Sequence, residues 1–311
     1  MTISAVWKCP DWKARLGWTA GLAVVLCVLF AGLLYDLIGR WTSEPQYSHG
    51  FVIPLMAVGL AYFRRHKLTT GTGRSHGGGL LLIVAGVILH LVARYFYVEL
   101  ADCAGLLSCI AGIVLLVWGR RFTLAFWPAI AFLAFMFPLP FRMEQMLSVP
   151  LQLLGAQEAV WYIQALGIPA FAQGSMIHMS DVQLGVAEAC SGIRMLMVFV
   201  AISAATMIIS QRTRWEKLLI LVSALPIALA CNIARIVATA VAYQWVGSET
   251  ADLIFHDLSG WLMMPAAMGL LFLELRLLDW LLVEVKNPLA RVSASRQAPG
   301  IISVLPQSGQ S

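Results

Sequence analysis

Residues 78–98 read GGLLLIVAGVILHLVARYFYV, and residues 101–118 continue as ADCAGLLSCIAGIVLLVW. Each stretch is apolar over about the 20 residues that a helix needs to cross a hydrocarbon core of roughly 30 Å. Only Glu99 and Leu100 separate the two stretches. This pattern predicts two membrane-spanning helices that follow each other directly.

The whole chain has the same apolar character. Of its 311 residues 60% are hydrophobic and only 12% are charged, whereas a soluble domain carries about 25% charged residues. We therefore predict an all-α, polytopic membrane helix bundle with about eight transmembrane helices and no sizeable soluble domain. The expected spans are residues 16–38, 47–63, 78–98, 101–118, 122–138, 190–210, 217–245 and 256–280.

The net charge of +5 does not indicate nucleic-acid binding, because the basic residues form short clusters between apolar spans. These clusters fall in alternate loops, and cytoplasmic loops carry the excess of Lys and Arg. Both termini are therefore predicted to be cytoplasmic. The clusters are Lys8/Lys13/Arg15, Arg64/Arg65/Lys67/Arg74, Arg120/Arg121, Arg212/Arg214/Lys217 and Arg276/Lys286/Arg291/Arg296.

Residues 139–189 are the one long stretch predicted outside the bilayer, on the extracytoplasmic side. Apolar residues at near-helical spacing predict that the first part lies on the membrane surface. After Gly174, alternating apolar residues around Ser180-Asp181 predict a small β-hairpin. The predicted organisation is a cytoplasmic N-terminus (1–15), a transmembrane domain (16–285) containing this segment, and a disordered cytoplasmic tail (286–311).

Counting residues from the neighbouring cytoplasmic basic cluster places three reactive side chains at a similar depth. Cys190, Arg235 and His256 lie 22, 18 and 20 residues from such a cluster, or about 33, 27 and 30 Å along a helix. All three are thus predicted at the extracytoplasmic ends of their spans.

These residue types can together perform acyl transfer. A thiol attacks as its thiolate, which a helix N-terminus or a nearby cation stabilises. Cys190 begins a predicted helix, and Arg194 follows one turn later. His256 can carry a proton near neutral pH, and Arg235 can stabilise an oxyanion. We predict chemistry at a peptide bond beside the membrane.

The motifs around these residues are specific. Residues 186–194 read VAEACSGIR, residues 232–236 read NIARI, and Phe255-His256 follows them in order. The stretch YSHGFVIP at residues 47–54 completes a pattern that resembles the exosortase/archaeosortase family of membrane cysteine transpeptidases. The similarity covers residues 40 to 280, and the His at position 256 is similar to the bacterial branch.

This resemblance implies a substrate class, a location and the roles of three residues. The substrates would be exported proteins with a C-terminal sorting signal: a short motif such as Pro-Glu-Pro, a transmembrane helix and a basic cluster. Cleavage would take place at the periplasmic face of a bacterial inner membrane. Cys190 would be the nucleophile, with Arg235 and His256 as its partners. The subfamily, the exact substrate motif, the final acceptor and the oligomeric state stay open.

Four further residues are supporting candidates, and three of them have two open roles each. Glu188 and Asn232 either orient Arg235 or Cys190 or form a structural pair. His49 either lines the substrate groove or caps a helix. Arg194 is the second cation near the thiol. The sequence contains no cofactor motif, no Cys-x-x-Cys and no His-Glu-x-x-His, so we expect neither a cofactor nor a metal.

Two other functions compete with an enzyme. In a transporter, Arg235 and His256 would bind an anion or relay protons, and Cys190 would have no role. An assembly factor for polysaccharide export would tolerate the loss of all three residues. The expected partners are exported proteins and membrane lipid, not nucleic acid.

The predicted orientation can be tested by labelling. A cysteine introduced near position 250, such as Ser248→Cys, should react with a membrane-impermeant thiol reagent added to the outside of intact cells. The measurement is the extent of labelling before and after permeabilisation. Reaction only from the cytoplasmic side would invert the topology.

Overall fold

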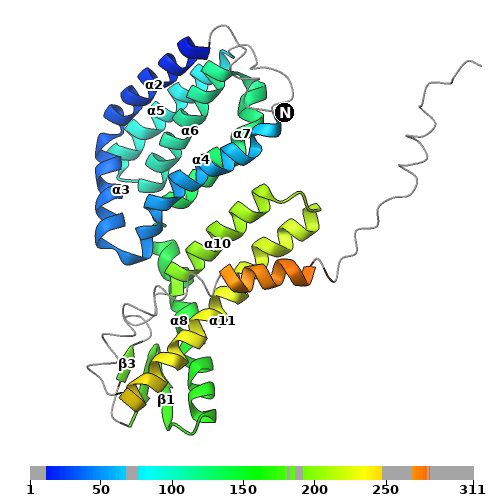
Figure 1. Cartoon of the computed structure of the whole chain (residues 1–311). Coiled ribbons are helices and arrows are strands. Elements are labelled where there is room, and N and C mark those ends of the chain that lie inside the picture. Colours follow the sequence, from blue (N-terminus) through cyan, green and yellow to red (C-terminus); the bar gives the residue numbers. More distant parts are fainter. Residues whose placement is uncertain are drawn as a thin grey trace, which may run out of the picture.

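The computed structural model of the protein describes residues 12–67, 76–180, 183–185, 192–246, 268–278 and 280, and this part is mostly helical (Figure 1). By length and composition, four of its helices can cross a membrane, or five if the bent pair Arg120–Met136 and Phe141–Ala165 forms one span. The expected helical membrane protein is confirmed at this level, and the count of eight spans stays a prediction. The predicted tail, residues 286–311, lies outside the described residues.

The N-terminal half forms one bundle, shown in blue to green in Figure 1. Its centre contains fully or almost fully buried side chains such as Phe30, Leu37, Ile53, Cys109 and Phe132. The helices are α2 (Trp12–Leu29), α3 (Ala31–Ser43), α4 (Val52–Arg64), α5 (Gly78–Phe96), α6 (Glu99–Trp118) and α7 (Arg120–Phe132), with the short 3₁₀ helices η1 (Pro45–Phe51), η2 (Arg65–Lys67) and η3 (Leu133–Met136).

Three of the predicted spans differ from the observed elements. The first, 16–38, is divided between α2 and α3, which meet at the fully buried Phe30. The second was expected from residue 47, but α4 begins only at Val52, after η1. The span expected to end at 138 leaves α-helical geometry after Phe132, and Pro138 and Pro140 disfavour its continuation.

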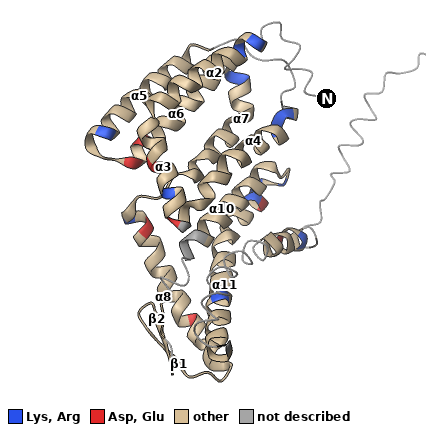
Figure 2. Cartoon of the chain, turned by 60° about the vertical axis from the view of Figure 1, so that its left-hand side comes forward, with Lys and Arg blue, Asp and Glu red and all other residues tan. Residues whose placement is uncertain are grey.

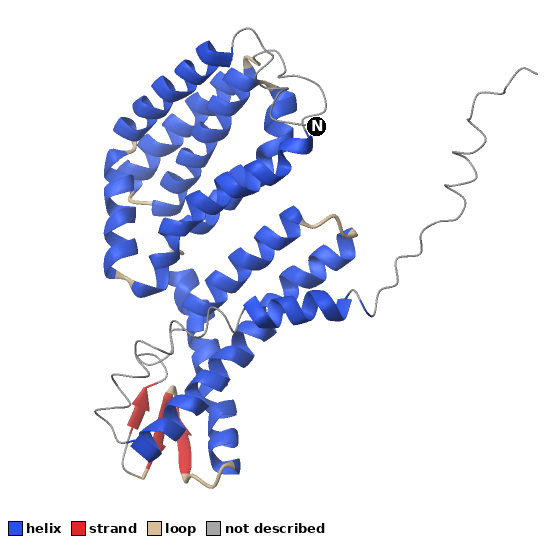
Figure 3. Cartoon of the chain, viewed as in Figure 1, coloured by secondary structure: helices blue, strands red, loops and turns tan. Residues whose placement is uncertain are grey.

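The C-terminal half is built on two antiparallel helices and the segment before them. Figure 3 shows that the only strands drawn lie together at one end of this half, beside the end of α11. The elements are α8 (Phe141–Ala165), β1 (Ala170–Gln173), β2 (Met176–Met179), β3 (Gln183–Gly185), α10 (Gly192–Ile209), α11 (Arg214–Val246) and a helix at residues 268–278.

The segment expected on the membrane surface contains a long helix and a sheet. α8 is 25 residues long and bends by 79° from the preceding helix. The three strands pair antiparallel in the order β1-β2-β3. Ile177 and Leu184 face each other across β2 and β3 and are both buried, so one side of the sheet completes a core with α8 and α11.

The helix α11 is too long to lie entirely within a bilayer. Its 33 residues extend about 50 Å, compared with a hydrocarbon core of roughly 30 Å. Its C-terminal part packs against α8, with Ile236 and Ala240 fully buried beside Ala156 and Ile163. One side of the C-terminal part of α11 therefore packs in a small protein core, whereas Trp245 at its end is 81% exposed.

α5 and α6 pack very closely, and glycines make this possible. A Cβ added at Gly86 would lie 2.6 Å from the Cys109 sulfur and 2.7 Å from the Gly105 carbonyl oxygen. A Cβ at Gly112 would lie 2.8 Å from the Gly79 carbonyl oxygen. Small residues let membrane helices approach to backbone contact, so these four glycines set the α5–α6 distance.

We predict that Gly86→Ala lowers the free energy of unfolding by about 1–3 kcal/mol, the usual cost of overpacking, because the Gly105 backbone cannot move aside. The matched control is Gly39→Ala in α3, where an added Cβ meets nothing within 4 Å. The thermal unfolding midpoint of each variant in detergent is the measurement. Equal midpoints for both variants would contradict the close packing.

Candidate active site

Two of the predicted site residues lie on the buried side of α11. Arg235 is 7% exposed and Asn232 is 3% exposed, and their separation of three residues puts them on the same side of the helix. A guanidinium that is removed from water needs compensating partners. Arg235 is thus a charged side chain on the buried side of α11.

α8 passes close to these residues at Gly155. A Cβ added at Gly155 would lie 3.5 Å from Asn232 Nδ2 and 3.5 Å from Ile236 Cδ1. The amide of Asn232 therefore faces α8 at Gly155, with room for a methyl group between them. Sequence analysis did not single out Gly155, because nothing local shows that a glycine in one helix faces another helix.

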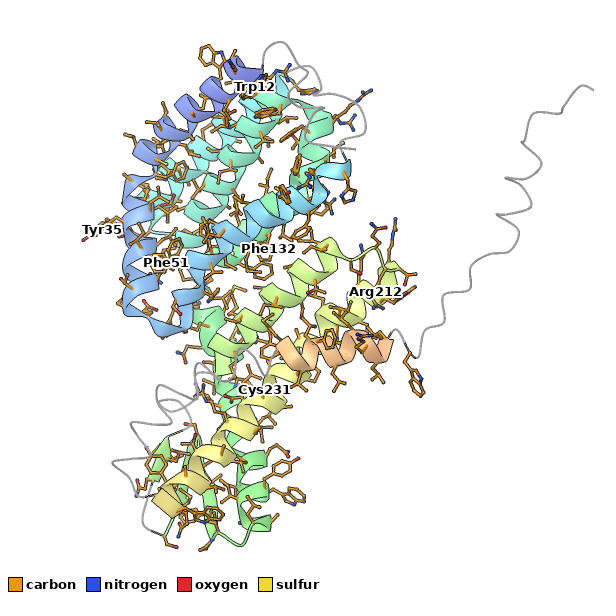
Figure 4. The ribbon with its side chains drawn as sticks, viewed as in Figure 1. Trp12, Tyr35, Phe51, Phe132, Arg212 and Cys231 are labelled. Atoms are coloured by element: carbon orange, nitrogen blue, oxygen red, sulfur yellow. The ribbon has the colours of Figure 1, made fainter. Side chains whose placement is uncertain are left out.

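α10 lies antiparallel to α11 and begins near the level of Arg235. Near its start, Leu196 lines a small cavity with Asn232 of α11 and Leu151 of α8. Along α10, the first residue Gly192 lies about 6 Å before Leu196. Along α11, Arg235 lies about 4.5 Å beyond Asn232, in the same direction. Figure 4 marks this level of α11 by the label of Cys231.

Asn232 also carries an unsatisfied polar atom. Its side-chain oxygen Oδ1 is buried and has no hydrogen-bond partner among the described residues. Buried polar atoms are nearly always paired, so this acceptor calls for a donor.

The remaining predicted site residues are only partly described. Cys190, Glu188 and His256 lie outside the described residues. Arg194 belongs to the first turn of α10, but its side chain lies outside the described part. The structure thus brings Asn232 and Arg235 together on α11 and places the start of α10 beside them.

The element η1, which carries His49, lies at the junction of the two halves. It contacts α3, α4, η3 and α10, and the Tyr47 hydroxyl donates a 2.9 Å hydrogen bond to Glu144 in the first turn of α8. Burial and this carboxylate raise the pKa of the Tyr47 hydroxyl. The Tyr47–Glu144 contact joins residues 97 positions apart, and sequence analysis did not detect it.

His49 has a structural environment inside η1. Its Nδ1 lies 3.1 Å from the Gln46 carbonyl oxygen, and burial lowers the pKa of its imidazole. The next residue, Gly50, lies against the indole ring of Trp41 and leaves no room for a side chain. His49 thus has backbone partners in both η1 and η3, at Gln46 and Phe135, and its two candidate roles stay open.

Comparison with known proteins gives one family. The model of the transmembrane exosortase family matches residues 41–273, which include every residue of the site described above. No curated protein and no solved structure gives a significant match. Because the family model covers most of the chain, this protein belongs to the transmembrane exosortase family.

Proposed function

We propose that this exosortase is a cysteine-dependent transpeptidase or protease that cleaves the C-terminal sorting signal of exported proteins. The reaction takes place at the extracytoplasmic end of α10 and α11, on the periplasmic face of a bacterial inner membrane. Cys190 is the nucleophile, and Arg235 and His256 are its partners. Glu188 and Arg194 support the charge balance near the thiol, and the amide of Asn232 orients either the thiol or the substrate.

The observation that carries this proposal is the buried guanidinium of Arg235 at the level where α10 begins. Cys190 stands only two residues before Gly192, the first residue of α10. The charge interactions of a cation are stronger in a buried apolar interface than in water, because the local dielectric is low. This arrangement supports a thiolate at Cys190 and an oxyanion next to it.

In the first step, the Cys190 thiolate attacks the scissile carbonyl carbon and forms a C–S bond. The electron pair of the carbonyl moves to oxygen, and Arg235 stabilises the resulting oxyanion. The tetrahedral intermediate then expels the amine of the sorting signal, which takes a proton from His256. The products are a thioester on Cys190 and the released transmembrane peptide.

In the second step, an amine-bearing acceptor or water attacks the thioester. His256, now neutral, accepts a proton from this nucleophile, and the Cys190 thiolate leaves. An amine acceptor makes the enzyme a transpeptidase, and water makes it a protease. The sorting signal of the substrate suits this site. If its basic cluster stays in the cytoplasm and its transmembrane helix crosses the bilayer, the short recognition motif lies at the outer membrane surface.

Cys190→Ala should abolish cleavage of a co-expressed protein that bears a C-terminal sorting signal, because no other group replaces the thiolate. The measurement is the mass shift of the substrate on a gel, at equal levels of enzyme in the membrane. Cys27→Ala, which changes an exposed cysteine of α2, is the control and should process normally. Processing that persists with Cys190→Ala would remove the nucleophile and favour a transporter or an assembly factor.

Arg235→Lys should slow the acylation step by about 10²–10³-fold, the usual effect of losing an oxyanion donor, because a Lys ammonium lacks the planar pair of donors. Single-turnover rates in membranes, with protein folding checked by size-exclusion chromatography, measure this effect. The control is Arg142→Lys, at an exposed arginine of α8. A full rate with Arg235→Lys would exclude the bidentate role.

A further inference from the structure

A second polar site lies in the N-terminal bundle. A pocket of about 460 Å³ opens between α3, α5 and α6, which is within the size range of small-ligand sites. Its apolar floor includes the buried residues Leu33, Leu37 and Ala93. Its lining residues come from these three helices, from the link Tyr97-Val98 between α5 and α6, and from Pro138, so the pocket is separate from the Arg235 site on α11.

The rim of the pocket carries charges of both signs. Arg40 Nη2 lies 2.5 Å from Glu99 Oε1, and Arg94 Nη1 lies 3.5 Å from Asp36 Oδ2. Figure 2 shows blue and red segments together at this end of α5 and α3. At the inner side, Asp102 lines the pocket and pairs with the buried His90.

These exposed ion pairs are not explained by stability alone. Pairs between solvent-exposed side chains contribute only about 0–1 kcal/mol, and all four side chains are at least one-third exposed. In the described part of the chain, each guanidinium makes one hydrogen bond, to its carboxylate. Arg has five N–H donors, so donors remain that can bind an anion.

Aromatic side chains place the pocket at the level of lipid headgroups. Tyr35 is 79% exposed, Tyr95 is 78% exposed and Tyr97 is 93% exposed, and Tyr35 points away from the bundle in Figure 4. Tyr and Trp gather where a membrane protein passes from hydrocarbon to water. The pocket therefore opens beside the outer headgroup layer, given the predicted orientation.

We propose that this pocket binds a phosphoethanolamine group, supplied by an aminophospholipid of the outer leaflet. Arg40 and Arg94 bind the phosphate, because guanidinium groups suit phosphate oxygens. Asp36 and Glu99 bind the ammonium, and the apolar floor covers the glycerol and the first carbons of the acyl chains. The proposal does not depend on Cys190 or on the proposed reaction.

The charge pattern favours ethanolamine over choline. A primary ammonium has three N–H donors and can bind both carboxylates of the rim. A quaternary ammonium has none and is usually held by a cage of aromatic rings, and the one aromatic residue that lines the pocket is Tyr97. An acidic lipid such as phosphatidylglycerol would satisfy the arginines and leave the two carboxylates without a cation.

The experiment is native mass spectrometry of the purified full-length protein, titrated with dioctanoyl phosphatidylethanolamine, phosphatidylcholine or phosphatidylglycerol. We expect the ethanolamine lipid to bind at least about tenfold more tightly than the choline lipid, as the loss of charge-assisted hydrogen bonds predicts. Equal affinity for the two lipids would overturn the proposal. If glycerophosphoethanolamine binds as tightly as the lipid, the acyl chains do not contribute, and a membrane lipid as the source of the phosphoethanolamine group would be overturned.

Variants separate the two halves of the site. Arg40→Gln with Arg94→Gln should lower the affinity for all phosphate lipids by about tenfold or more, whereas Asp36→Asn with Glu99→Gln should remove only the preference for ethanolamine. Arg120→Gln, at an exposed arginine of α7, should change neither. If the double arginine variant does not fold, the double carboxylate variant alone tests the proposal. A preference for ethanolamine that persists in the carboxylate variant would overturn the proposal. Displacement of the lipid by an acidic sorting-signal peptide would also overturn it.

Discussion

The length of α11 is the constraint around which the C-terminal half is organised. A helix of 33 residues exceeds the hydrocarbon thickness by about 20 Å, and its outer part must bury apolar residues such as Ile236 and Ala240. α8 and the small sheet supply that cover. The same packing removes Arg235 and Asn232 from bulk solvent, so the structural need for a core outside the bilayer also creates a site with a low dielectric.

The site around Arg235 and Asn232 contains polar groups that are buried, and burying polar groups costs free energy. A buried guanidinium and a buried amide oxygen without a described donor reduce stability unless other groups pair with them. Proteins tolerate such groups where chemistry needs them. The hydrogen bond from Tyr47 to Glu144 and the core shared with α11 hold α8 in position beside Asn232.

The N-terminal bundle has a different physical basis. The glycines of α5 and α6 bring these helices into backbone contact, which makes them a rigid pair. The C-terminal end of α5 and the N-terminal end of α6, with α3, form a separate charged pocket. The family match spans both halves, and η1 connects them through its contacts with α3, α4 and α10. α10 also contributes Ala201, Ala204 and Ala205 to the core of the N-terminal bundle, so the two halves share a packed interface.

The sequence by itself determined the helical membrane class and the family, because span length, apolarity and short motifs are local properties. It also placed Arg235 in the C-terminal half of its helix, since position along a helix follows from counting residues at a constant rise. Tertiary structure alone decided the break at Phe30, the packing of α8 along α11 and the Tyr47–Glu144 bond. Tertiary structure alone also decided the pocket between α3, α5 and α6. Each depends on contacts between residues far apart in the chain, whose partners no local pattern can identify.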